Sequence, residues 1–142
     1  MRNIGRSILA VLAGVVACGI VIFAVEAVSS QVFPLPPGTD LTDPDAIRAA
    51  VADLPLGAFV FLLLAWFVGV FAGAWVAARL APQSPFVHGM IVTGLVVVGA
   101  AVNLATLPHP GWMWVAGPAV ILASGWLGAR LGGRGRAIPA PV

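Results

Sequence analysis

The sequence has very little charge, which excludes an ordinary soluble domain. Only 8% of its 142 residues are charged and 61% are hydrophobic, whereas charged residues make up roughly a quarter of a typical globular domain. The mean hydropathy is +1.06. We therefore expect a protein that lies within a lipid bilayer.

Cysteine and histidine are scarce as well. Cys18 is the only cysteine, so an intramolecular disulfide and a Cys-x-x-Cys redox pair are excluded. The two histidines, His88 and His109, are separated by about 31 Å of predicted helix, too far to share a metal ion within one subunit. We predict interfacial loop positions for both histidines, no metal site and no cofactor.

What the sequence does contain is four long apolar segments. A helix of about 20 residues crosses the hydrocarbon core of a bilayer, and each segment approaches or exceeds that length. The segments predict an all-α polytopic fold in a single transmembrane domain, with spans at residues 7–30, 55–80, 86–107 and 111–131, an outer loop at 31–54 and a tail at 132–142. So little chain remains outside the spans that we expect no catalytic domain and no enzyme.

The charges are divided between the two ends of the predicted bundle. Six of the seven arginines lie before the first span, at the end of the second, or at the end of the fourth and beyond it, while the four aspartates lie in the loop at 31–54. This positive-inside bias predicts a multi-pass membrane protein with both termini in the cytoplasm. We expect lipid headgroups, rather than nucleic acid, to be the ligands of Arg79, Arg130, Arg134 and Arg136.

The outer loop is predicted to contain a short helix. Thr42 or Asp43 can cap it, and Pro44 suits its first position because proline has a fixed φ and needs no amide partner there. The apolar residues that follow fall on one face. We therefore predict an amphipathic helix at residues 44–52, lying on the outer surface of the membrane.

Small residues recur at four-residue spacing in the predicted spans, and such stripes let helix backbones approach closely. The principal packing positions are Gly14, Gly69, Gly73 and Gly128. Together with the acidic outer loop, these faces favour a structural or accessory role. In that role the chain docks onto other membrane subunits or onto copies of itself.

One acidic residue, Glu26, lies inside an apolar segment. Insertion of a carboxylate at mid-membrane costs about 2.5–3.5 kcal/mol, and less toward the interface. We therefore expect Glu26 to have a structural or functional partner. It can pair with Arg48, hydrogen-bond to Asn103, or bind a proton or cation in an outward-facing vestibule. The alternative function is therefore an oligomeric small-solute or ion transporter or channel that uses Glu26 and Asn103, with Ser29 and Thr106 nearby.

A weak internal repeat relates the two halves of the chain. Residues 75–80 and 126–131 share the pattern Trp-x-x-Ala-Arg-Leu, and Glu26 with Ser29 aligns with Asn103 and Thr106. One interpretation is a duplicated hairpin with an axis along the membrane normal, which places Glu26 and Asn103 at one depth facing the same bundle axis. The other is convergence, because Trp and Arg gather at any inner interface.

The Pro-Pro-Gly at 36–38 with its Asp-rich loop, residues 75–80, Asn103 and residues 108–114 carry a further likeness. On these motifs the chain, from Arg6 to Leu131, resembles a family of small four-helix bacterial inner-membrane proteins. The resemblance implies the fold and the membrane. It transfers no activity.

Overall fold

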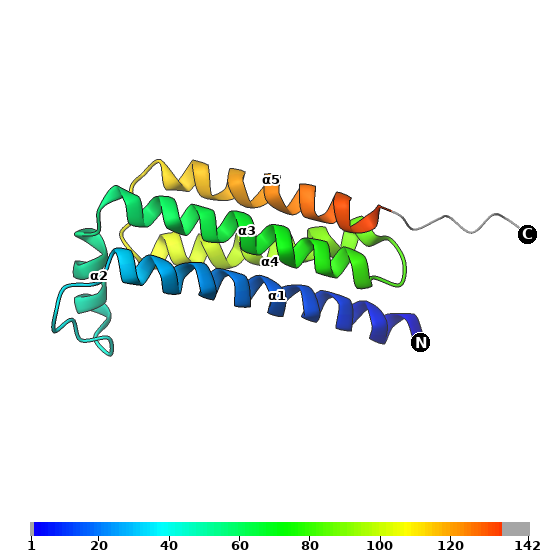
Figure 1. Cartoon of the computed structure of the whole chain (residues 1–142), viewed down its shortest axis with the longest axis horizontal. Helices are drawn as coiled ribbons and strands as arrows, with labels where there is room; N and C mark the ends of the chain where they lie inside the picture. Colours follow the sequence, from blue (N-terminus) through cyan, green and yellow to red (C-terminus); the bar gives the residue numbers. More distant parts are fainter. Residues whose placement is uncertain (1, 135–142) are drawn as a thin grey trace, which may run out of the picture.

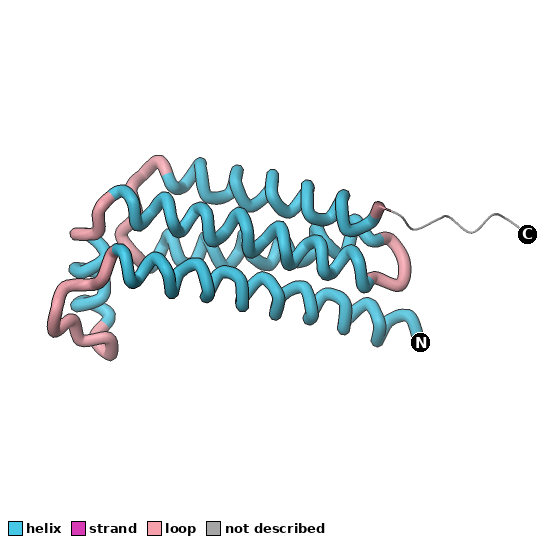
Figure 2. Tube along the Cα trace, viewed as in Figure 1, coloured by secondary structure: helices cyan, strands magenta, loops and turns pink. Residues whose placement is uncertain are grey.

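The structure is a computed structural model that describes residues 2–134, and in that range it contains only helices. Four of the five are long and apolar enough to cross a membrane, as the sequence predicted. Figure 2 shows a longer connection, which contains the fifth helix, between the first two of them and shorter loops between the others. In chain order the helices are α1 (Arg2–Val32), α2 (Pro44–Ala52), α3 (Leu56–Leu80), α4 (Pro85–Thr106) and α5 (Met113–Gly133).

The observed boundaries differ from the predicted ones mainly at the first and last spans. α1 extends beyond the predicted 7–30 in both directions, since no proline interrupts the chain before Pro34. α5 continues to Gly133, so the tail that was predicted to begin at residue 132 begins at Arg134. The remainder of the predicted tail lies outside the described residues.

The helices form a bundle in which α3 is central. In Figure 1, α5, α3 and α1 lie side by side and α4 lies behind them. α3 contacts α1, α4 and α5, whereas α1 packs mainly on α3 and only lightly on α4. Within residues 2–134, α1 and α5 do not contact each other. One seam, between α1 and α4, is therefore less closely packed than the others.

The two ends of the bundle carry opposite charge. The N-terminus, the α3–α4 turn and the end of α5 lie at one end, with α2 and the α4–α5 loop at the other (Figure 1). We call them the basic end, which carries Arg6, Arg79, Arg130 and Arg134, and the acidic end, which carries Asp40, Asp43, Asp45 and Asp53.

Close helix contacts are made where glycine leaves room for a neighbouring backbone. A Cβ on Gly73 would lie 2.6 Å from both the Gly14 carbonyl oxygen and the Cys18 Cβ, and a Cβ on Gly69 would lie 3.1 Å from the Cys18 carbonyl oxygen. Gly128 lies against the backbone of α3. All four glycines singled out in the sequence thus lie at contacts within this chain, where a partner subunit cannot reach them.

The two hairpins proposed as a repeat do not pack alike. α1 and α3 approach at Gly14 and Gly73, which the repeat aligns with Ile91 and Ser124. α4 and α5 approach at Gly89, where a Cβ would lie 2.9 Å from the Cα of Ala129, and at Gly125, where a Cβ would lie 2.8 Å from the Thr93 Cβ. Moreover, α3 contacts α4 while the equivalent pair, α1 and α5, does not. The packing therefore does not follow the two-fold axis that duplication predicts.

Candidate functional site

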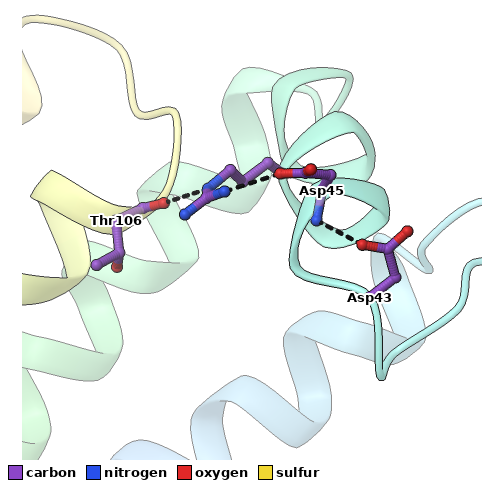
Figure 3. A network of polar contacts seen from close by, with 4 residues as sticks. Asp43, Asp45 and Thr106 are labelled. Carbon is purple, nitrogen blue, oxygen red and sulfur yellow. Dashed lines mark hydrogen bonds and ion pairs between the residues drawn. The ribbon is translucent and has the colours of Figure 1, made fainter.

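At the acidic end, α2 is tied to the end of α4 by one arginine. Asp43 caps α2, its carboxylate accepting a hydrogen bond from the Asp45 amide at 2.9 Å. Arg48 donates to the Asp45 carboxylate at 2.8 Å and to the Thr106 carbonyl at 3.1 Å, as Figure 3 shows. The last carbonyls of a helix lack intrahelical donors and attract cations. Arg48 therefore holds α2 across the end of the bundle.

The loop before α2 is ordered by its own polar groups. The Asp40 carboxylate accepts hydrogen bonds from the Thr42 hydroxyl at 2.7 Å and from the Thr42 amide at 2.8 Å. These bonds lower the pKa of Asp40 below its usual range, because they favour the charged carboxylate. Much of the acidic loop is thus engaged in local structure.

A partly open cavity of about 260 Å³ lies at the acidic end, lined by residues of α1, α2, α3 and α4 and of the loops that join them there. We call it the end cavity. Its walls are mostly apolar, and Val51 and Leu54 are its lining residues from the α2 region. Its polar lining residues are Glu26, Ser29, Ser30, Asn103 and His109.

A second hollow, of about 400 Å³, follows the seam between α1 and α4. We call it the α1–α4 groove. Glu26, Leu62 and Asn103 line both the groove and the end cavity. The other lining residues of the groove are Val15, Cys18, Gly19, Ile22, Trp66, Val96, Gly99 and Ala100. Glu26 and Asn103 therefore lie where the end cavity meets the groove.

Neither pairing that the sequence suggested for Glu26 is present. Arg48 bonds to Asp45 and Thr106 instead, and Glu26 forms no hydrogen bond or ion pair within residues 2–134. The Oδ1 atom of Asn103 is buried and has no hydrogen-bond partner. An unsatisfied buried acceptor costs about 1–3 kcal/mol. The site thus holds two acceptor groups without donors.

The structure places only some of the other predicted polar-site residues beside Glu26 and Asn103. Ser29 lines the end cavity. Thr106 lines neither hollow, and its hydroxyl donates to the Val102 carbonyl of its own helix at 2.9 Å. Glu26 is exposed and Asn103 half-buried, and the two line the same pair of hollows, so Glu26 is not buried inside the bundle. The peripheral place of α1 explains the difference.

His109 belongs to the end cavity, and sequence reasoning missed this. It lies in the α4–α5 loop, as predicted, with its ring edge-on to Phe59 at a centroid distance of 5.7 Å. No sequence spacing links His109 to Glu26, since a loop and a distant helix meet there only through tertiary folding. His88 lies in the first turn of α4, in agreement with the span predicted at 86–107, but it is not the interfacial loop residue expected: it is 7% exposed and has Nδ1 3.2 Å from the Ser84 carbonyl oxygen.

The basic end gathers the predicted headgroup arginines. Arg79 donates to the Arg134 carbonyl at 3.2 Å, and the Arg130 guanidinium lies 4.8 Å from the ring centroid of Trp126, a cation–π distance. Arg130 and Arg134 border a hollow of about 440 Å³. Arg136 lies outside the described residues.

The end cavity combines the Glu26 carboxylate and the Asn103 amide with the Ser29 and Ser30 hydroxyls and the His109 ring, and none of its lining residues among the described ones is Arg or Lys. Its two unpartnered groups, the carboxylate and the amide oxygen, are hydrogen-bond acceptors. Within residues 2–134, no group of three or more His, Cys, Asp or Glu side chains could hold a metal ion. Comparisons with protein-family models, with curated proteins and with solved structures found no match to this chain.

Proposed function

We propose that this chain is a solute-binding membrane protein, one subunit of an oligomeric transporter or channel, with its binding site at Glu26 and Asn103. The observation that carries the proposal is that, within residues 2–134, neither the Glu26 carboxylate nor the Asn103 Oδ1 atom receives a hydrogen bond, and that both residues line the same cavity. A charged acceptor in a low-dielectric site is stabilised by a cation or a strong donor. A small cationic solute is the ligand that meets both needs.

The proposed orientation follows from the distribution of charge. We place the protein in a bacterial inner membrane with both termini in the cytoplasm, because Arg79, Arg130 and Arg134 share one end of the bundle. The end cavity then opens toward the outside, where Glu26 first meets a solute. Since the α1–α4 groove is on the bundle surface, a path for the solute through the membrane would run along an interface between subunits.

A structural or accessory role is the second candidate, and an uncovered glycine on the bundle surface favours it. A Cβ on Gly5 of α1 would meet no other atom within 4 Å, so a partner helix could approach the backbone there. In this role the chain docks onto other membrane subunits through this position and through exposed carboxylates such as Asp53.

Uptake of methylammonium into proteoliposomes tests the first candidate. We expect Glu26→Gln to reduce methylammonium uptake by about tenfold or more, which corresponds to a loss of at least about 1.4 kcal/mol in binding. Asp53→Asn is the matched control, because it removes an exposed carboxylate that lines neither hollow, and it should leave uptake unchanged.

Purification in mild detergent at native expression separates the two candidates. A pure homo-oligomer with Glu26-dependent uptake supports the transporter. Foreign subunits in fixed stoichiometry, with uptake equal in the wild type and Glu26→Gln, would reject the transporter in favour of the accessory role.

A further inference from the structure

We propose that the end cavity and the α1–α4 groove together bind one single-chain amphiphile, with a primary ammonium head at Glu26 and Asn103 and its alkyl chain in the groove. This inference rests on the proposed function and names the class of solute. It starts from the three residues that line both hollows, Glu26, Leu62 and Asn103, because through them the end cavity and the groove adjoin at the two polar side chains.

The head of the ligand is identified by the unpaired acceptors. A primary ammonium carries three N–H donors, which can serve the Glu26 carboxylate, the Ser29 hydroxyl and, once the half-buried Asn103 side chain turns toward the ligand, its Oδ1 atom, which is buried in the structure. A quaternary ammonium carries the charge but no donor, so it would leave Asn103 Oδ1 unsatisfied. An anionic head would meet the Glu26 carboxylate with no Arg or Lys among the described lining residues to offset it.

The tail of the ligand is identified by the shape and lining of the groove. From Glu26 to Val15 the groove follows α1 for about 16 Å. Its walls in this stretch are apolar, and a Cβ on Gly19 or Gly99 would meet no other atom within 4 Å. The space in front of these two glycines is therefore free for an alkyl chain.

The groove ends partway along the length of the bundle. Toward the basic end α1 and α4 touch, since a Cβ on Gly14 would lie 3.0 Å from the Val92 Cγ2 atom. A partner's transmembrane helix would have to continue past this contact, whereas a single alkyl chain can stop before it. At the other end Val51 and Leu54 of the α2 region leave the head a cavity of about 260 Å³.

The test measures binding of radiolabelled dodecylamine to the full chain in phosphatidylcholine nanodiscs, with partition into empty nanodiscs subtracted. We expect saturable binding that is about tenfold tighter than that of dodecyltrimethylammonium, a difference of about 1.4 kcal/mol. Glu26→Gln should lose both dodecylamine and methylammonium binding. Lauric acid should not compete.

Filling the groove separates this inference from the proposed function. Gly99→Leu places a side chain in the groove and should weaken dodecylamine binding by about tenfold while methylammonium binding is retained. Gly94→Leu is the matched control, because Gly94 lies on the same helix, faces open space and does not line the groove. Gly19→Leu, on the opposite wall, repeats the test should Gly99→Leu fail to fold.

Several results would overturn the inference. Equal dodecylamine binding by Gly99→Leu and Gly94→Leu would show that no alkyl chain occupies the groove. Equal binding of dodecyltrimethylammonium and dodecylamine would show that the site does not select a primary ammonium head. Displacement of dodecylamine by phosphatidylethanolamine at equal concentration would assign the site to a bilayer lipid instead. In each case Glu26-dependent methylammonium binding would leave the proposed function standing, and its absence would reject both.

Discussion

Helix α1 makes two seams that differ in how they use small residues. Against α3, Gly14 and Gly73 bring the two backbones into direct contact, and a Cβ on either would collide with the other's carbonyl oxygen at 2.6 Å. Against α4, Gly19 and Gly99 face open space instead, along a groove of about 400 Å³. The same residue type therefore closes one seam and leaves the other open.

The difference teaches that a glycine in a membrane helix has no fixed structural meaning. It contributes to packing only when the opposite helix comes close enough to fill the space, since interiors are stabilised by dense contact. The open seam also holds Glu26 and the unpaired Asn103 oxygen. Weak packing and unsatisfied polar groups thus coincide, as expected where a protein binds a ligand rather than itself.

The largest expected effect is at the closed seam. Gly73→Leu should destabilise the fold by about 3 kcal/mol or more, because backbone atoms of α1 would have to move. Thermal unfolding in detergent measures it. Gly94→Leu, facing open space, should change stability by no more than about 0.5 kcal/mol. Equal destabilisation by the two variants would break the distinction between closed and open positions.

A smaller effect of opposite sign is expected at the open seam. Asn103→Leu removes a buried oxygen that has no donor, so it should stabilise the apo protein by about 1 kcal/mol while abolishing methylammonium binding. Thr93→Val is the comparison, because its buried hydroxyl donates to the Gly89 carbonyl at 2.9 Å. That variant should lose about 1 kcal/mol. A loss of stability in Asn103→Leu would show that Asn103 has a structural partner.

The smallest expected effect concerns Gly99, one of the two glycines that face open space along the groove. Gly99→Ala adds a methyl group that meets no other atom within 4 Å, and it removes the conformational freedom of glycine. We expect the melting temperature to rise, corresponding to about 0.5–1 kcal/mol. A fall would mean that another part of the bundle, or a second copy, already contacts this position.

Much of the candidate site was accessible from the sequence, and its limits have physical causes. Glu26 and Asn103 could be singled out because polar groups are costly within apolar segments. The pairing of Glu26 with Arg48 was wrong, because the exposed carbonyl at the end of α4 and the Asp45 carboxylate hold the guanidinium. His109 could not be linked to the cavity, since no local pattern records which loop covers which helix.

The sequence by itself determined the four apolar helices, the short helix that begins at Pro44 and the gathering of arginines at one end. These follow from hydrophobic length, capping and alternation of direction, which are local properties of the chain. Only the tertiary structure decided that α1 lies at the edge of the bundle, and hence which glycines are covered and which border a groove. The reason is that burial depends on the neighbouring helix as much as on the residue, and the choice of neighbour is made by the whole chain.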